Sequence, residues 1–189
     1  MNSEQRLPTR LEPERAVLVV IDLQERFRDL IHGMDQVLER SGRLIAFCRQ
    51  LEIPVLVTEQ YPRGLGVTVT EIREACRPFT AYEKTAFSCA GSPEFLQALR
   101  ATGRTQVVLC GIETHVCVYQ TACDLLREGF QVALAADAVS SCNAADRDLG
   151  LQRLRDVGAD VMGTQMIMFE IVREAGTPAF RSVAALLRN

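Results

Sequence analysis

Three polar residues follow or end apolar segments of this chain and carry side chains suited to nucleophilic chemistry. Asp22 follows the apolar run at 16–21, Lys84 ends the segment 79–84, and Cys117 lies shortly after the run at 105–110. A thiol becomes a strong nucleophile once it loses its proton, and a carboxylate can accept that proton. A lysine ammonium stabilises a neighbouring negative charge. The three side chains could therefore form a nucleophile with its base and its electrostatic partner.

Each of these residues also has a purely structural interpretation. Asp22 could cap a helix that starts near Leu23, Lys84 could be an exposed surface lysine, and Cys117 could be a small buried core residue. However, an unpaired carboxylate at the end of a six-residue apolar strand is costly to bury. Asp22 therefore needs a cation or a donor nearby, and pairing with Lys84 favours the chemical interpretation.

The segment from Gly111 to Val118 is typical of a strand, a turn and the start of a helix. It would place the Cys117 thiol in the first helical turn, where free backbone N–H groups and the helix dipole favour thiolate over thiol. His115 precedes Cys117 by two residues, and adjacent turn residues rarely align an imidazole on a thiol. We expect His115 to line the pocket or to cap the helix.

Short apolar runs alternate with segments of helical spacing along the chain. Strands are expected at 16–21, 55–57, 105–110 and 132–135, with weaker ones at 79–84 and 159–162. Helices are expected at 34–50, 93–100, 114–128, 143–157 and in the C-terminal tail. This alternation predicts an α/β fold: a three-layer, Rossmann-like domain of about six parallel strands with helices on both faces. Ligands bind beyond the carboxyl ends of such strands, so the three chemical residues should meet on one rim.

Length and composition narrow the class of protein. The 189 residues, 48% of them hydrophobic and 24% charged, predict a single domain over 1–189 with an N-terminal extension at 1–14. A net charge of -3 without a dense Lys and Arg stretch argues against a nucleic-acid partner. The polar first residues are unlike a secretory signal, and no apolar run is long enough to span a membrane. We expect a cytoplasmic protein with a small-molecule substrate and no membrane partner.

The cysteines do not resemble a disulfide framework or a zinc site. There are seven, an odd number, and most lie inside apolar stretches. No C-x-x-C pair and no Cys/His cluster at zinc spacing occurs. We therefore expect no metal and no other cofactor.

Over about residues 16–172 the chain resembles the isochorismatase-like cysteine hydrolase superfamily. The resemblance rests on the motifs Val19 to Phe27, Glu83 to Thr85 and Gly111 to Val118, in that order, with a further match at Ala136 to Ser141. The run Thr58 to Gly66 is similar to the branch that contains animal isochorismatase-domain proteins. The resemblance implies a Rossmann-like sheet and a homo-oligomer.

The resemblance also implies roles for individual residues. Asp22, Lys84 and Cys117 would be the catalytic triad. A cis peptide between Ile112 and Glu113 would aim the backbone N–H groups of Glu113 and Cys117 into an oxyanion hole. The residues expected to contact the substrate are Phe27, Glu59, Tyr61, Thr114 and His115.

Two departures from better-known members narrow the reaction. Nicotinamidases resemble one another in an Asp-x-His metal pair after the second strand, where this chain has Thr58, Glu59 and Gln60. Enzymes that cleave isochorismate, a vinyl ether, generally lack the nucleophilic cysteine. The sequence therefore predicts a metal-independent cysteine hydrolase of a small amide or related C–N bond, acting through an acyl-enzyme on Cys117. The alternatives are a redox-responsive or ligand-binding protein without turnover, and a vinyl ether hydrolase.

Overall fold

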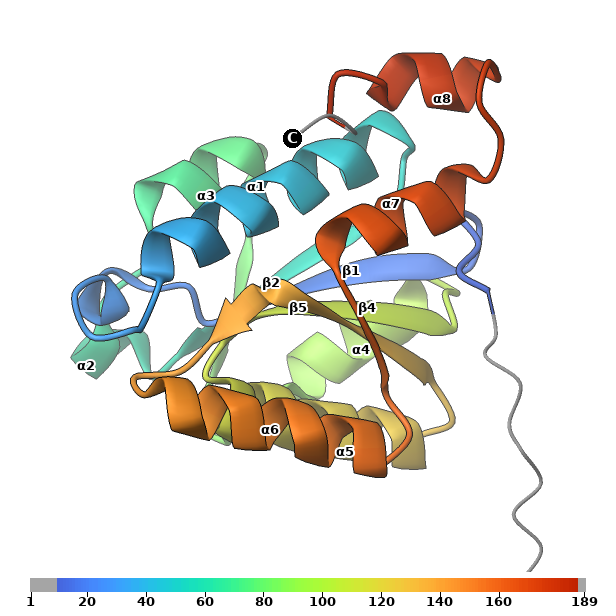
Figure 1. Cartoon of the computed structure of the whole chain (residues 1–189). Helices are drawn as coiled ribbons and strands as arrows, with labels where there is room; N and C mark the ends of the chain where they lie inside the picture. The colour runs from blue at the N-terminus through green and yellow to red at the C-terminus, as the bar shows by residue number, and fades with distance from the viewer. Residues whose placement is uncertain (1–9, 187–189) are drawn as a thin grey trace, which may run out of the picture.

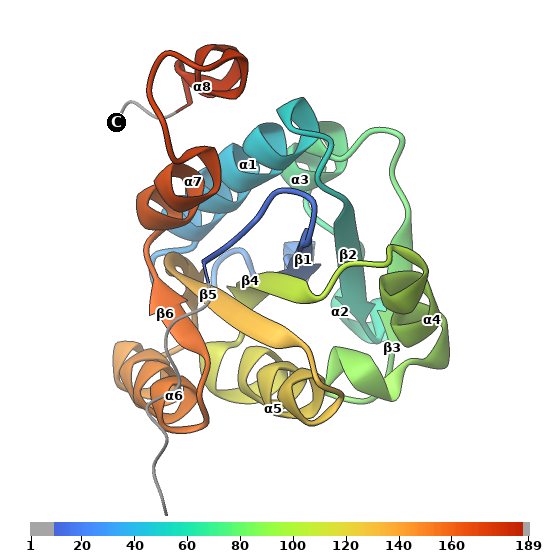
Figure 2. The ribbon, with the colours of Figure 1, turned by 90° about the vertical axis from the view of Figure 1, so that its right-hand side faces the viewer.

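A six-stranded parallel sheet forms the centre of the molecule in the computed structural model, which describes residues 10–186 (Figures 1 and 2). The strands are β1 (Ala16–Ile21), β2 (Val55–Gln60), β3 (Ala81–Lys84), β4 (Gln106–Ile112), β5 (Gln131–Ser140) and β6 (Asp160–Met162). Their order across the sheet is β3-β2-β1-β4-β5-β6, and every neighbouring pair is parallel. The predicted α/β architecture and strand number are confirmed.

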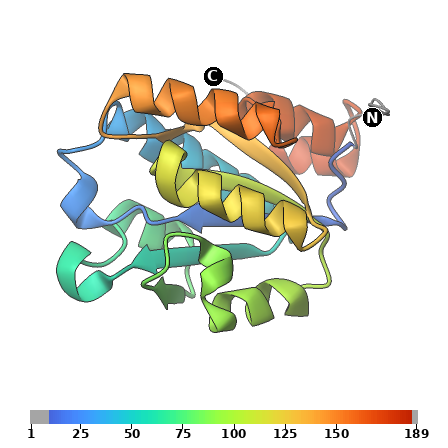
Figure 3. The same ribbon diagram turned by 90° about the horizontal axis from the view of Figure 1, so that it is seen from below.

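Helices cover both faces of the sheet and make it the middle of three layers (Figures 1 and 2). One face carries α1 (Met34–Gln50), α3 (Thr70–Ala75) and α7 (Thr164–Val172), with α8 (Pro178–Val183) outside α1. The other face carries α4 (Pro93–Ala101), α5 (Tyr119–Arg127) and α6 (Ala144–Asp156), and Figure 3 shows α5 and α6 lying side by side. No helix within residues 10–186 is long and apolar enough to cross a membrane.

The central strand β1 is buried along its whole length because both faces of the sheet are covered. Leu18 and Val20 belong to the core cluster on the α1 side, whereas Val17, Val19 and Ile21 belong to the cluster on the α4 and α5 side. This alternation follows from the two-residue period of a strand. It fixes β1 between the two cores and places Asp22 at its carboxyl end.

A glycine lets the end of β4 approach β1 closely. Gly111 has a φ of 114°, and a Cβ at this position would overlap the carbonyl oxygen of Ile21. Only glycine fits such a close backbone approach without strain. The approach brings the segment after β4, which contains Cys117, next to Asp22 at the end of β1.

Two predicted segments differ from the observed ones. The helix expected at 114–128 begins as a π-helical turn, η3 (Thr114–Val118), before α5 continues it. The strand expected at 55–57 is longer and runs to Gln60. Gln60 pairs with Lys84 and extends β2, and Pro62 then starts the single-turn helix α2 (Pro62–Leu65). Proline at a first helical position has the right φ for such a turn.

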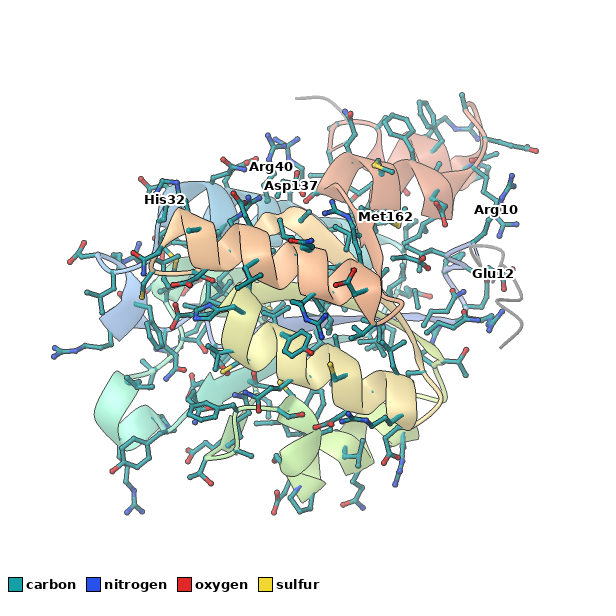
Figure 4. The ribbon with its side chains drawn as sticks, turned by 60° about the horizontal axis from the view of Figure 1, so that its bottom comes forward. Arg10, Glu12, His32, Arg40, Asp137 and Met162 are labelled. Carbon is teal, nitrogen blue, oxygen red and sulfur yellow. The ribbon has the colours of Figure 1, made fainter. Side chains whose placement is uncertain are left out.

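Part of the predicted N-terminal extension packs against the domain. The backbone N–H of Leu11 donates to Glu170, and the side chain of Gln106 binds the backbone of Arg10 and Glu12. Figure 4 shows Arg10 and Glu12 at this edge of the molecule. Residues 1–9 of the predicted extension lie outside the described residues.

A bulge in β5 carries Asp137. The register of β5 against β4 jumps from Leu134 opposite Leu109 to Val139 opposite Gly111. Within the bulge, Asp137 accepts hydrogen bonds of 2.7 and 2.8 Å from the backbone N–H and hydroxyl of Thr164, the first residue of α7. Arg40 lies beside it, 3.8 Å from its carboxylate (Figure 4). Asp137 therefore caps the start of α7.

Candidate active site

Asp22, Lys84 and Cys117 meet at the carboxyl ends of β1, β3 and β4. The Nζ of Lys84 lies 2.7 Å from Oδ2 of Asp22, with the two side chains 0% and 2% exposed. The thiol of Cys117 and the Asp22 carboxylate line the same cavity, and burial and the charge of Asp22 raise the pKa of the thiol. Three segments that are far apart in the sequence thus bring a thiol, a carboxylate and an ammonium together.

The ammonium of Lys84 is fully engaged by protein acceptors. Besides Asp22 it donates to Oε1 of Gln60 at 2.6 Å and to the carbonyl oxygen of Phe87 at 3.0 Å, with the carbonyl of Ala86 at 3.4 Å. Three ammonium protons therefore face four acceptors. The interpretation of Lys84 as an exposed surface lysine is excluded.

Asp22 is held by backbone and side-chain contacts on β2. The hydroxyl of Thr58 donates to Oδ1 of Asp22 at 2.7 Å and also lies 3.6 Å from Sγ of Cys89. The backbone N–H of Asp22 donates to the Thr58 carbonyl. The helical turn that follows, η1 (Glu25–Phe27), has Gln24 rather than Asp22 as its N-cap. Asp22 does not serve as a helix cap.

Burial decides the protonation state of the thiol. It raises the pKa of Cys117 to about 12, and the charge of Asp22 adds to this while Lys84 opposes it. This pKa keeps Cys117 a neutral thiol at neutral pH, whereas the start of a helix alone would favour the thiolate. The short π-helical turn does not outweigh the loss of water and the adjacent carboxylate.

Burial and mutual attraction shift the pKa values of Asp22 and Lys84 as well. Burial raises the pKa of the Asp22 carboxyl, and Lys84 opposes this shift only in part. Burial lowers the pKa of Lys84, but the charge and hydrogen bond of Asp22 together with the neighbouring cysteines outweigh it, and the net shift is upward. Lys84 is thus a permanent cation near neutral pH, while Asp22 is a stronger base than an exposed aspartate.

A cavity of about 100 Å³ opens in front of Cys117. Its apolar wall consists of Phe27, Leu65, Phe87, Ile112 and Val116. Its polar lining consists of Asp22, Gln60, Glu113 and Cys117. Of the five residues expected to contact a substrate, only Phe27 lines this cavity.

The other four expected contacts lie elsewhere. Glu59 accepts hydrogen bonds of 2.7 Å from both the backbone N–H and the hydroxyl of Thr68. Tyr61 is 53% exposed and lines a different cavity, beside β3. Thr114 is fully buried, and Nδ1 of His115 lies 2.9 Å from the Ser141 hydroxyl. None of these four side chains lines the cavity in front of Cys117.

Sequence reasoning missed Gln60, Leu65, Phe87 and Val116 as lining residues. A signal for Gln60 exists, because it lies two positions after Thr58 on the same strand and so shares its face. Thr58 and Gln60 hold Asp22 and Lys84 respectively. Leu65 and Phe87 come from loops, where no periodicity indicates the direction of a side chain.

The turn that carries Cys117 rests on α6. A Cβ at Gly150 would lie 2.9 Å from the backbone nitrogen of His115 and 3.0 Å from the carbonyl carbon of Thr114. Such distances leave no room for a side chain, so the backbone of α6 contacts the backbone of η3 directly. The position of the thiol therefore depends on the packing of α6.

The peptide bond between Ile112 and Glu113 is cis, as expected from the resemblance. Among residues 10–186, no backbone carbonyl accepts a hydrogen bond from the N–H of Glu113. The carboxylate of Glu113 is turned to the backbone N–H of Cys142 at 2.9 Å. The N–H of Glu113 is thus available as a donor at the cavity.

Within the described part of the chain, no three His, Cys, Asp or Glu side chains are grouped so that they could hold a metal ion. At the position where nicotinamidases carry their metal pair, Thr58, Glu59 and Gln60 are all engaged in hydrogen bonds to protein groups. The donor set at this site does not fit a metal.

Comparison with known proteins agrees with the fold and the motifs. The isochorismatase domain model matches residues 16–166. Isochorismatase domain-containing protein 2 of Danio rerio is 41% identical over 182 residues, which cover 95% of this chain and 90% of that protein. The secreted isochorismatase effector Isc1 of Phytophthora sojae is 38% identical over 185 residues, which cover 95% of this chain and 88% of that protein.

A solved structure is similar to this chain in both sequence and fold. The structure titled MAR1 ribonuclease from Caenorhabditis elegans is 37% identical and superposes with a TM-score of 0.89, covering 95% of this chain and 92% of that one. The chain therefore belongs to the isochorismatase domain family, with a hydrolase fold of the isochorismatase-like superfamily.

Proposed function

We propose that this protein is a metal-independent cysteine hydrolase that cleaves a small amide or a related C–N bond through an acyl-enzyme on Cys117. The observation that carries the proposal is the buried Lys84 and Asp22 pair, whose carboxylate lines the same cavity as the Cys117 thiol. Membership of a hydrolase family supports the general reaction class.

In the proposed first step, Asp22 removes the proton from Cys117 and the sulfur attacks the carbonyl carbon of the substrate. Because burial raises the pKa of the thiol, proton removal and attack take place together rather than from a preformed thiolate. Asp22 then delivers the proton to the leaving nitrogen as the C–N bond breaks. Lys84 keeps the carboxylate in place and balances its charge in the step where Asp22 is ionised.

In the proposed second step, Asp22 takes a proton from water, which attacks the thioester. The C–S bond breaks, the carboxylic acid leaves, and Cys117 recovers its proton. In both steps the negative charge on the carbonyl oxygen would be stabilised by the backbone N–H groups of Glu113 and Cys117. Donors in this role commonly contribute roughly 3–4 kcal/mol each to lowering the barrier.

The two alternative functions have less support. Redox-sensing cysteines are exposed and have a low pKa, whereas Cys117 is 7% exposed and burial raises its pKa to about 12. An isochorismate substrate would bring carboxylates into a cavity whose lining includes Asp22 and Glu113 but no Lys, Arg or His. Both the redox function and the vinyl ether reaction are therefore disfavoured.

We further propose that the protein works in a reducing compartment such as the cytoplasm, as a homo-oligomer. All seven cysteines are free, which suits a reducing environment. Large apolar side chains are exposed on α6 and α7, at Leu149, Met166 and Phe169, and such side chains are common where subunits meet. Analytical ultracentrifugation of the full chain measures the assembly directly.

The test is a hydrolysis assay with small amides, N-carbamoyl compounds, isochorismate and single-stranded RNA, since one structural relative is titled a ribonuclease. Wild type should release ammonia from amides, and Cys117→Ala should release none. Cys123→Ala is the matched control, because Cys123 is a half-buried cysteine of α5 that does not line the cavity. Amide hydrolysis that survives in Cys117→Ala would refute the nucleophile, and cleavage of RNA alone would refute the amide substrate.

A further inference from the structure

The cavity in front of Cys117 is small compared with ordinary ligand sites. Its volume is about 100 Å³, whereas an apolar cavity that binds one benzene molecule measures about 150 Å³. Typical binding sites for larger ligands measure roughly 300–1,000 Å³. An acyl group bound here must therefore be smaller than a benzoyl group.

The cavity also lacks a partner for a negatively charged substrate. No Lys, Arg or His side chain belongs to its lining. The nearest cation, Lys84, has its three protons distributed among Asp22, Gln60 and backbone carbonyls. A substrate carboxylate would be buried beside Asp22 and Glu113 without a counter-charge, which is strongly unfavourable.

One wall of the cavity is fixed by two buried polar side chains. The amide of Gln24 donates to the carbonyl oxygens of Gln60 at 3.0 Å and Gly66 at 2.6 Å, on either side of α2. Glu59 binds both donors of Thr68 at the end of the same loop. Leu65, the last residue of α2, is held between these anchor points and faces the cavity. Its position is therefore set by the frame and not by the ligand.

We propose, on the basis of the hydrolase function above, that the site selects short, uncharged aliphatic acyl groups, as in acetamide to isobutyramide, and that Leu65 sets the upper limit of acyl size. Phe87 also lines the cavity and is 54% exposed. Leu65 is a specificity-determining residue in this proposal, while Gln24 and Glu59 position it.

The first test uses alkylation of Cys117, which does not require hydrolysis. Rates with iodoacetamide, iodoacetate and N-phenyl iodoacetamide are measured by peptide mapping and divided by the rates with free cysteine at the same pH. The corrected rate with iodoacetamide should exceed the other two by roughly tenfold or more. N-phenyl iodoacetamide is too large, and even one extra methylene in an apolar pocket commonly costs roughly 10-fold to 200-fold. Iodoacetate is small enough, but its carboxylate would be buried without a counter-charge. Equal corrected rates for the three reagents would overturn the proposal.

The second test uses variants of the wall. Leu65→Ala should raise the corrected rate with N-phenyl iodoacetamide by roughly tenfold and leave iodoacetamide little changed. Phe87→Ala should raise the same rate. Because Phe87 is 54% exposed, this variant provides the test if Leu65→Ala fails to fold. Val67→Ala is the matched control, because Val67 lies on the same loop, is 48% exposed and does not line the cavity. The assignment of the wall would be contradicted if Val67→Ala raised the rate with N-phenyl iodoacetamide as much as the other two variants do. It would also be contradicted if neither Leu65→Ala nor Phe87→Ala raised that rate.

Turnover separates failure of this inference from failure of the hydrolase function. Wild type should hydrolyse acetamide and isobutyramide with a higher kcat/KM than benzamide or succinamate, and Leu65→Ala should narrow the gap to benzamide. Equal turnover of benzamide and isobutyramide would refute the selectivity and leave the hydrolase in place. Selective alkylation without turnover of any amide would refute the hydrolase and support the selectivity of the cavity.

Discussion

The Nζ of Lys84 lies 2.7 Å from the carboxylate of Asp22, and neither side chain is more than 2% exposed. Such a pair is not an efficient way to stabilise a fold, since each charge loses its water. Its presence at the ends of β1 and β3, beside a cavity that a thiol also lines, is more readily explained by chemistry.

Removing one member of this pair should destabilise the fold more than removing both. Lys84→Met leaves the Asp22 carboxylate buried without its cation, and we expect the free energy of unfolding to fall by about 3–5 kcal/mol. Asp22→Asn combined with Lys84→Met should recover a large part of that loss. Urea denaturation of the single and double variants measures both values. A double variant less stable than Lys84→Met would contradict the expectation.

Alkylation of Cys117 should become faster with pH well above neutrality. Because burial raises the pKa of the thiol to about 12, the reactive thiolate fraction is small at neutral pH and grows roughly tenfold per pH unit below that value. The rate with iodoacetamide, followed by peptide mapping, should therefore rise without a plateau up to about pH 9, the upper end of the measurement. A plateau near neutral pH would show a resting thiolate instead.

Asp22→Asn should change hydrolysis and alkylation in opposite directions. The charge of Asp22 is one of the causes that raise the pKa of Cys117, so its removal should lower that pKa and speed alkylation at neutral pH. Hydrolysis should fall by roughly a hundredfold or more, because the base is lost. Both rates are measured on the same preparation. If alkylation slows together with hydrolysis, Asp22 acts in some other way, such as holding the turn in place.

Two mid-helix glycines should respond differently to alanine. Gly42 in α1 has no atom within 4 Å of the place where a Cβ would stand, whereas the same atom at Gly150 would lie 2.9 Å from the backbone of His115. Alanine favours a helix over glycine by about 1 kcal/mol, so Gly42→Ala should raise the Tm. Gly150→Ala should not, and it should lower kcat/KM because it displaces the turn with Cys117. Equal gains in Tm with unchanged activity would contradict the contact of α6 with that turn.

Much of the fold could be predicted because buried parallel strands appear as apolar runs. The run at 16–21 forms β1 with the predicted bounds, and α1 spans the predicted residues 34–50. The meeting of Asp22, Lys84 and Cys117 also follows from sequence, since the ends of parallel strands converge on one rim. Residue type at a strand end is a local property and can be read directly.

The shape and protonation of the site could not be predicted in this way. Leu65 and Phe87 reach the cavity from loops, and the loop that carries Leu65 is held by Gln24 and Glu59, two polar residues with no apolar period to indicate their direction. The neutral Cys117 thiol depends on burial and on an adjacent carboxylate, both of which are properties of the folded chain. Glu59 was accordingly expected to contact a substrate, whereas its carboxylate binds Thr68.

The central claim is a covalent acyl-enzyme on Cys117, and product partitioning tests it most directly. Propionamide and methyl propionate are each supplied with hydroxylamine, which competes with water for the acyl group. A common thioester predicts the same ratio of hydroxamate to propionic acid from both substrates, and neither product from Cys117→Ala. A ratio that changes with the leaving group, or products that persist in Cys117→Ala, would contradict the account.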